Sequence, residues 1–236
     1  MKLTLTKTFI WLTIFSIAMG YLETAVVVYL RKIYYPEGFG FPLNPIGNDI
    51  VITELLREVS TLIMLIGIAV IAGKNALQRL AFFLFSFAVW DIFYYVFLYV
   101  LIGWPQSLLT WDILFLIPMP WVGPVLSPLI ITLLMILFAG IIVFFDLKGI
   151  KARVSLKEWL LFITGAVTVI ISWTWDYSRY IISINPDESI WSFSSKEALF
   201  EANQKYVPQS FNWSLFIFGA LLILLSISMF FVRNKK

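Results

Sequence analysis

The chain has 236 residues, of which 61% are hydrophobic and only 13% are charged, and this excludes a water-soluble globular domain. The mean hydropathy of +0.91 indicates instead a protein that lies in a lipid bilayer. Because cysteine and histidine are both absent, disulfides, thiolate zinc sites and histidine-ligated haem are excluded, and we expect neither a metal nor a cofactor.

Six apolar segments are each close to the roughly 20 residues that cross a bilayer as a helix. They cover residues of about 9–31, 51–73, 79–103, 125–146, 157–176 and 211–232. The predicted fold class is therefore all-α, and residues 1–236 are predicted to form a single transmembrane domain of six helices.

A proline-rich segment, from Ile117 to Pro128, separates the third predicted helix from the fourth. Prolines at this density prevent a regular helix. Irregular backbone at membrane depth survives only where protein or a water-filled cavity satisfies it. We therefore expect this segment to be an interfacial turn or a shallow re-entrant loop.

The basic residues set the orientation, because cytoplasmic loops of membrane proteins carry the excess of lysine and arginine. With both termini inside, the cytoplasmic segments contain Lys2, Lys7, Lys74, Arg79, Lys148, Lys151, Arg153, Lys157, Arg233, Lys235 and Lys236. The sequence thus predicts cytoplasmic termini. The formal net charge of +3 reflects this topology, and we expect no nucleic-acid partner.

Three acidic residues, Glu23, Glu58 and Asp91, lie near the middle of the first three predicted helices. By the helical rise they fall within a slab about 6 Å deep. Glu54, Arg57 and Glu58 share one helix face, so Arg57 is predicted to bridge both glutamates. Polar residues inside a membrane can simply hold helices together. A cluster of ionisable residues at one depth is nevertheless a functional-site hypothesis.

Aromatic residues accompany these carboxylates. Tyr94 and Tyr95 follow Asp91 by one helical turn, so we predict that they reach back to its carboxylate. Asp176 and Arg179 are three residues apart and are predicted to pair. Near the mouth of the same pocket we place Asp112, Trp121, Asp176 and Arg179.

Two local patterns predict helix starts. Asp49 is expected to be the N-cap of the second spanning helix. Ser194 and Glu197 fit a capping box, which predicts a short amphipathic helix on the outer surface.

An acidic, aromatic lining is suited to a cation or a cationic amphiphile, because carboxylates and ring faces both attract positive charge. The sequence contains no Walker loop, zincin motif or recognisable nucleophile arrangement. We therefore favour a membrane protein that binds or transports a small cationic or amphiphilic ligand, or an ion, in a pocket open to the outer face. The predicted ligand-binding residues are Glu23, Arg57, Glu58, Asp91, Tyr95, Asp112, Trp121, Asp176 and Arg179.

Two alternatives stay open. A buried carboxyl group could perform acid–base chemistry on a lipid or isoprenoid, which would make the protein a membrane-embedded enzyme with no catalytic residue yet assigned. The charged cluster could instead only hold together a non-catalytic subunit of a membrane complex. The expected partners are membrane lipid, a small-molecule or cation ligand and, in the last interpretation, another membrane subunit.

Four strings, ETAVVVYLR (23–31), LLREVSTLIML (55–65), VWDIFYY (89–95) and FLIPMPWVGPV (115–125), suggest a resemblance to known sequences. They are similar to those of a family of bacterial polytopic inner-membrane proteins that has no assigned activity. The resemblance covers most of the chain from Tyr21 to Pro128. It implies a location in the bacterial inner membrane and carries no information on mechanism.

Overall fold

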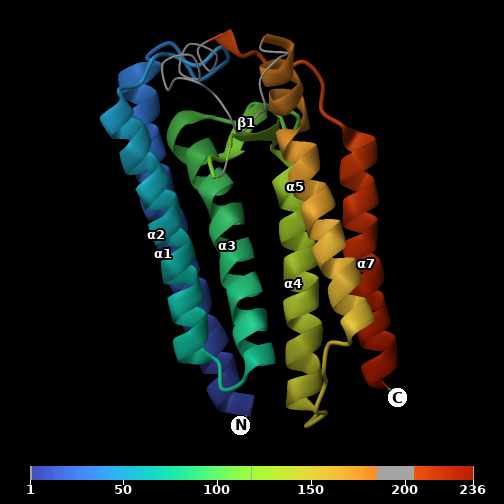
Figure 1. The fold of residues 1–236 in the computed structure, drawn as a ribbon. Coiled ribbons are helices and arrows are strands. Elements are labelled where there is room, and N and C mark those ends of the chain that lie inside the picture. Colours follow the sequence, from blue (N-terminus) through green and yellow to red (C-terminus); the bar gives the residue numbers. More distant parts are fainter. Residues whose placement is uncertain (1, 118, 185–204, 236) are drawn as a thin grey trace.

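The computed structural model describes residues 2–117, 119–184 and 205–235. In this part of the chain, six long helices and one two-stranded sheet are present (Figure 1). The helices are α1 (Lys2–Tyr34), α2 (Asn48–Ala72), α3 (Ala76–Ile102), α4 (Leu126–Leu147), α5 (Leu156–Ile184) and α7 (Trp213–Lys235). All six are long and apolar enough to cross a membrane, so the prediction of an all-α polytopic membrane protein is confirmed.

The helices run alongside one another, with the N- and C-terminal ends at the same end of the bundle (Figure 1). Helices α1, α2 and α3 form one half, and α4, α5 and α7 form the other. Helix α3 joins the halves, because it packs against both α1 and α4. The two strands lie at the end of the bundle away from the termini.

Helix α1 approaches α3 closely at a pair of small residues. A Cβ atom at Gly20 would lie only 3.0 Å from the carbonyl oxygen of Trp90. One turn later, the Thr24 hydroxyl donates a hydrogen bond to the Tyr94 carbonyl oxygen, 3.1 Å away. Small residues allow such close approach of helices in membranes. The contact places Glu23, which precedes Thr24, beside the turn of α3 that runs from Asp91 to Tyr94.

Helices α5 and α7 cross at two glycines that face each other. A Cβ atom at Gly165 would lie 2.8 Å from the Gly219 carbonyl oxygen, and a Cβ atom at Gly219 would lie 2.9 Å from the Gly165 carbonyl oxygen. Nearer the termini, the Ser226 hydroxyl donates to the Glu158 carbonyl oxygen across the same pair of helices (2.8 Å). Backbone contact at the glycines therefore sets the separation of these two helices.

Helix boundaries differ from the predictions in α2 and in α5. Helix α2 begins at Asn48 with Gly47 at the N-cap, so the prediction of Asp49 as the cap is wrong: Asp49 lies in the first turn, where its charge favours the helix dipole. Helix α5 continues eight residues beyond position 176, because no glycine or proline interrupts it before Ile184. The predicted capping box at Ser194 and Glu197 lies outside the described residues.

The segment between α3 and α4 contains the strands β1 (Trp111–Phe115) and β2 (Trp121–Pro124), which pair antiparallel. The sequence predicted only a turn or a re-entrant loop here, and no strand. Asp112 is opposite Gly123 in the register. At the base of the hairpin, the backbone N–H of Val125 donates to the Thr110 carbonyl oxygen (3.0 Å). The hairpin thereby gives Asp112 a fixed position above the first three helices.

Candidate functional site

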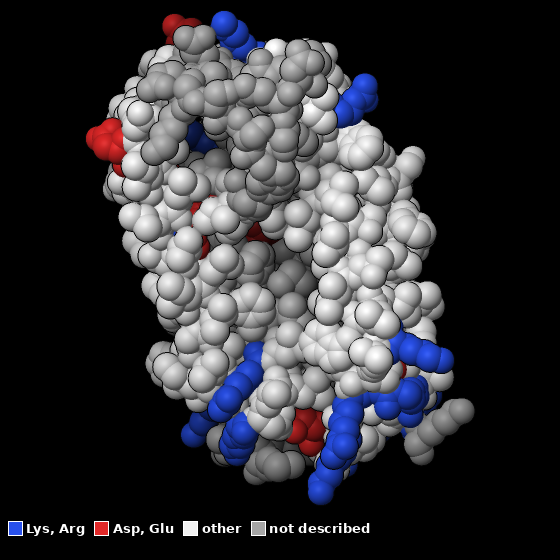
Figure 2. Space-filling view, in the orientation of Figure 1, with Lys and Arg blue, Asp and Glu red and all other residues white. Residues whose placement is uncertain are grey.

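A cavity of about 290 Å³ lies in the α1–α3 half of the bundle, beneath the hairpin and the loop of residues 35–47. Figure 2 shows acidic atoms inside a hollow on the face in view, toward the end away from the termini. Five carboxylates and two guanidinium groups belong to its wall: Glu23, Glu54, Glu58, Asp91, Asp112, Arg31 and Arg57. Aromatic side chains line much of the rest of the wall, namely Tyr35, Phe39, Trp90, Tyr94, Tyr95 and Phe115.

Arg57 links α2 to α1. Its guanidinium group donates to Glu54 Oε2 through Nε (2.9 Å) and NH2 (2.7 Å), and through NH1 it pairs with Glu23. The Thr61 hydroxyl also donates to Glu23 Oε2 (3.3 Å). The sequence predicted that Arg57 bridges Glu54 and Glu58; it bridges Glu54 and Glu23 instead. Adjacent residues on a helix point about 100° apart, which turns Glu58 away from Arg57.

Glu58 holds the hairpin instead. Both of its carboxylate oxygens accept the backbone N–H of Leu116, each at 3.1 Å. The Glu58 side chain is buried, and Leu116 directly follows β1. Glu58 therefore ties α2 to the end of the strand that carries Asp112.

Arg31 and Asp112 form a buried ion pair above the cavity. The distance from Arg31 NH2 to Asp112 Oδ1 is 3.0 Å, and the two residues are 7% and 1% exposed. The guanidinium carbon lies 4.2 Å from the ring centroid of Phe39 and 3.8 Å from that of Trp104. Tyr95 is a further hydrogen-bond partner of Asp112. The predicted contact of Tyr95 with Asp91 is thus replaced by one with Asp112.

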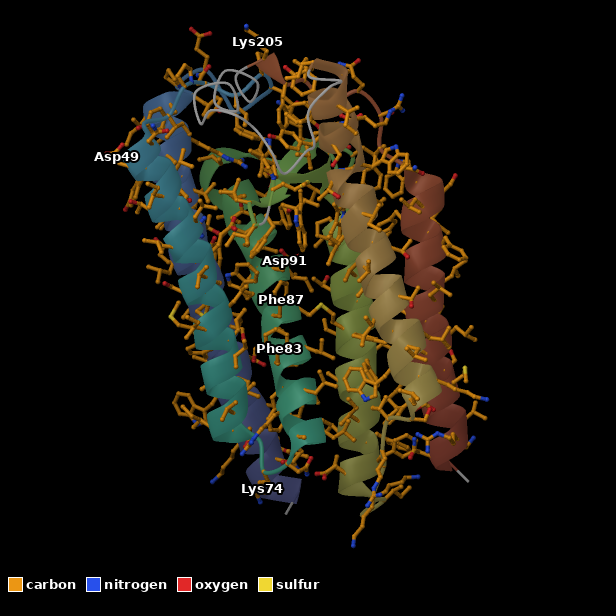
Figure 3. The ribbon with its side chains drawn as sticks, in the orientation of Figure 1. Asp49, Lys74, Phe83, Phe87, Asp91 and Lys205 are labelled. Carbon is orange, nitrogen blue, oxygen red and sulfur yellow. The ribbon has the colours of Figure 1, made fainter. Side chains whose placement is uncertain are left out.

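Four buried polar atoms on the cavity wall have no hydrogen-bond partner among the described residues. The two acceptors are Asp91 Oδ2 and Asp112 Oδ2, and the two donors are Arg31 NH1 and Trp90 Nε1. Buried polar groups are normally satisfied, so such atoms mark a place where a ligand or water completes the bonding. Asp91 lies near the middle of α3 and belongs to the cavity wall (Figure 3).

Burial raises the pKa of Asp112 from its ordinary value of 3.8 to about 6, although the Arg31 charge opposes this shift. The folded protein therefore binds more protons here than the unfolded chain does. This contribution to stability is complete below about pH 4 and is lost as the pH rises through about 6. We expect the unfolding midpoint of the wild type to fall, relative to Asp112→Asn, between about pH 4 and about pH 7. Parallel pH profiles of the two proteins in thermal unfolding would contradict this prediction.

Three of the predicted site residues lie outside the cavity wall. Trp121, in β2, stacks on Trp173 of α5 with ring centroids 5.6 Å apart, and it also packs against Phe115. Through Phe115, which does line the cavity, Trp121 supports the wall from behind.

Asp176 and Arg179 are the other two predicted site residues that lie outside the cavity wall. Asp176 accepts hydrogen bonds from the Tyr206 hydroxyl (2.9 Å) and from the backbone N–H groups of Gln209 and Ser210 (both 3.1 Å). It thus anchors to α5 the segment that leads into α7. These donors occupy both carboxylate oxygens, and among the described residues no ion pair joins Asp176 to Arg179, which is exposed. The predicted pair is therefore absent. Burial, with the Asp176 charge nearby, raises the pKa of Tyr206.

Arg31, Phe39 and Trp104 were not among the predicted ligand-binding residues. Arg31 and Phe39 line the cavity, and Trp104 packs against Arg31. Arg31 follows Glu23 by eight residues on the same face of α1, so the sequence placed it near the cavity, although not among the residues predicted to bind the ligand. Phe39 lies in an irregular loop and Trp104 lies beyond the end of α3, so no periodic pattern pointed to their packing against Arg31.

Within the described residues, no group of three or more acidic side chains is arranged to hold a metal ion. What the site offers is a cavity with more carboxylates than guanidinium groups, lined by aromatic rings and containing unsatisfied acceptors. Such a site can hold an organic cation by charge, by hydrogen bonds and by contact with ring faces. Comparison of the chain with models of known protein families, with curated proteins and with solved structures found no match.

Proposed function

We propose that this integral membrane protein binds a small cationic or amphiphilic ligand in the cavity between α1, α2, α3 and the hairpin, as a binding or transport protein. The observation that carries the proposal is Asp91. Among the described residues it has no cationic partner, and its Oδ2 atom is buried without a hydrogen bond.

The neighbouring charged groups of the cavity wall already have partners within the protein. Arg57 is engaged by Glu23 and Glu54, and Arg31 is engaged by Asp112. Glu58 accepts from backbone and has no guanidinium partner in the described part of the chain. A cation about 4 Å from an ionised carboxylate gains about 4 kcal/mol at an effective dielectric constant near 20. A positively charged ligand would therefore supply the charge that the wall lacks.

The ring faces near Asp91 favour an organic cation over a bare ion. Trp90, Tyr94 and Tyr95 flank Asp91 on α3 and belong to the cavity wall. Contact of a cation with such faces contributes about 0.5–2 kcal/mol, the upper values applying where water is excluded. Ammonium groups that carry alkyl substituents suit this lining, since they combine weak hydration with a positive charge.

The orientation that we propose places the cavity on the outer side of a bacterial inner membrane. On the face seen in Figure 2, most Lys and Arg side chains gather at the end of the bundle that carries the termini. Cytoplasmic segments carry this excess. The cavity lies at the opposite end and would be reached from outside the cell or from the outer leaflet.

The test compares Asp91→Asn with Asp49→Asn, a change of the same charge at an exposed position on the outer edge of α2 (Figure 3). We expect native mass spectrometry of gently extracted protein to show a bound small molecule in the wild type and in Asp49→Asn. Asp91→Asn should lose it, with an affinity at least about tenfold weaker. Because Asp91 has no ion pair and its Oδ2 atom no hydrogen bond among the described residues, the variant should stay folded.

Three results would argue against the proposal. Equal retention of the molecule by Asp91→Asn would remove Asp91 from the site. A stoichiometric partner protein without any small molecule would support a structural subunit. Conversion of an added lipid or isoprenoid by the wild type, absent in Asp91→Asn, would instead support the enzyme interpretation.

A further inference from the structure

An apolar stripe on α3 begins next to the acidic cavity. Phe87 and Phe83 precede Asp91 by four and eight residues, so the three side chains lie along one face of the helix (Figure 3). Both phenylalanines are half-buried and pack over the buried residues Leu65 and Trp90. The rings are in mutual contact, with centroids 6.0 Å apart for Phe83 and Phe87 and 5.1 Å apart for Phe87 and Trp90.

The position of the cavity in the bundle makes this stripe accessible from the side. Its wall comes from α1, α2, α3, the loop after α1 and the hairpin, and no described residue of α4, α5 or α7 contributes to it. The cavity is therefore off-centre, in one half of the bundle. In Figure 2, white side chains, which carry no charge, lie directly below the acidic atoms of the hollow. Because α3 is long and apolar enough to cross a membrane, lipid chains would reach this side of the bundle.

The two features together describe an amphipathic site. At its upper end are the unsatisfied carboxylate oxygens of Asp91 and Asp112, and at its lower end are Phe87 and Phe83. The distance along α3 from Asp91 to Phe83 is about 12 Å by the helical rise. That length suits a medium alkyl chain laid along the helix, and a small hydrophilic cation would leave it unused.

We propose that the ligand is a single-chain amphiphile with a cationic head, which enters from the lipid phase. The head binds between Asp91 and Asp112, and the chain lies over Phe87 and Phe83. This inference rests on the proposed function and narrows it to one class of ligand. The alkyl chain of the ligand would exchange contacts with lipid for contacts with the two aromatic rings. Its contribution to the binding free energy therefore comes from packing, and it is smaller than the gain from burying the same chain from water.

The experiment uses two probes with the same head, tetramethylammonium and decyltrimethylammonium, on the full chain in lipid nanodiscs. Binding is measured by equilibrium dialysis of radiolabelled probe, with empty nanodiscs subtracted. Affinity for the decyl probe is expressed per mole fraction in the bilayer, so that simple partitioning of the chain does not count as binding. The variants are Asp91→Asn, Phe87→Ala and Phe218→Ala, the last being a matched control at a lipid-exposed position of α7.

We expect Asp91→Asn to weaken the binding of both probes about tenfold or more. Phe87→Ala should lower the affinity for the decyl probe about fivefold and change the affinity for tetramethylammonium by less than about twofold. Phe218→Ala should change neither affinity. If Phe87→Ala leaves the decyl probe unchanged while Asp91→Asn still weakens both, the chain site is overturned and the cation site stands. If neither probe depends on Asp91, the proposed function fails together with this inference.

Discussion

Replacing Arg31 by methionine is expected to lower the free energy of unfolding by about 3–5 kcal/mol, because it leaves the buried Asp112 carboxylate without its counterion. Arg31 is 7% exposed and Asp112 is 1% exposed, so neither charge is well solvated in the folded protein. The guanidinium group also lies against the rings of Phe39 and Trp104, contacts that methionine replaces only in part. Equilibrium unfolding in mixed micelles, followed by tryptophan fluorescence, would measure the loss.

Two comparisons separate the charge from the packing. Lys32→Met removes a cation from the next position, which is exposed, and should change stability by less than about 0.5 kcal/mol. The double variant Arg31→Met/Asp112→Asn should recover much of the loss, because no unpaired charge then remains buried. A double variant that is as unstable as Arg31→Met alone would show that the aromatic contacts, and not the ion pair, make the larger contribution.

Introducing alanine at either glycine of the α5–α7 crossing is expected to destabilise the bundle by about 1–3 kcal/mol. At Gly165 the added Cβ atom would lie 2.8 Å from the Gly219 carbonyl oxygen and 3.0 Å from the Ile223 backbone nitrogen. These are backbone atoms, so the clash can be relieved only by moving one helix away from the other. Separation of the two helices would also weaken the contact between Ser226 and Glu158.

The matched control for this prediction is Gly140→Ala on α4, where an added Cβ atom meets nothing within 4 Å. That change should be neutral or stabilising by up to about 1 kcal/mol, since alanine favours the helix more than glycine does. The same unfolding assay applies to Gly165→Ala, Gly219→Ala and Gly140→Ala. Equal stability of all three variants would mean that the α5–α7 crossing relaxes without cost.

The membrane-spanning helices could be predicted because their signal is local. A helix that crosses a bilayer needs an uninterrupted apolar segment, and each of the six can be recognised without knowledge of its neighbours. The ends were less certain, as α5 shows by continuing to Ile184. The hairpin was missed because strands of only four and five residues, in a proline-rich segment, have no periodicity that separates them from a loop.

Part of the cavity could also be predicted, because depth along a helix is a simple function of residue number. Glu23, Glu58 and Asp91 were placed at one level on three helices, and all three belong to the wall of one cavity. Their binding role stays a prediction. The pairing of these groups could not be obtained in this way, since it depends on how each helix is rotated and which neighbour it meets.

The sequence by itself indicated that the protein lies in lipid and that it is helical. It also placed acidic residues near the middle of the first three membrane-spanning helices. Only the tertiary structure decided that Arg57 pairs with Glu23, that Glu58 holds the hairpin and that Arg31 pairs with Asp112 across 81 positions of the chain. The physical reason is the range of the interactions. Burial of apolar segments in lipid acts on each helix separately, whereas an ion pair needs two side chains that the fold brings within about 4 Å.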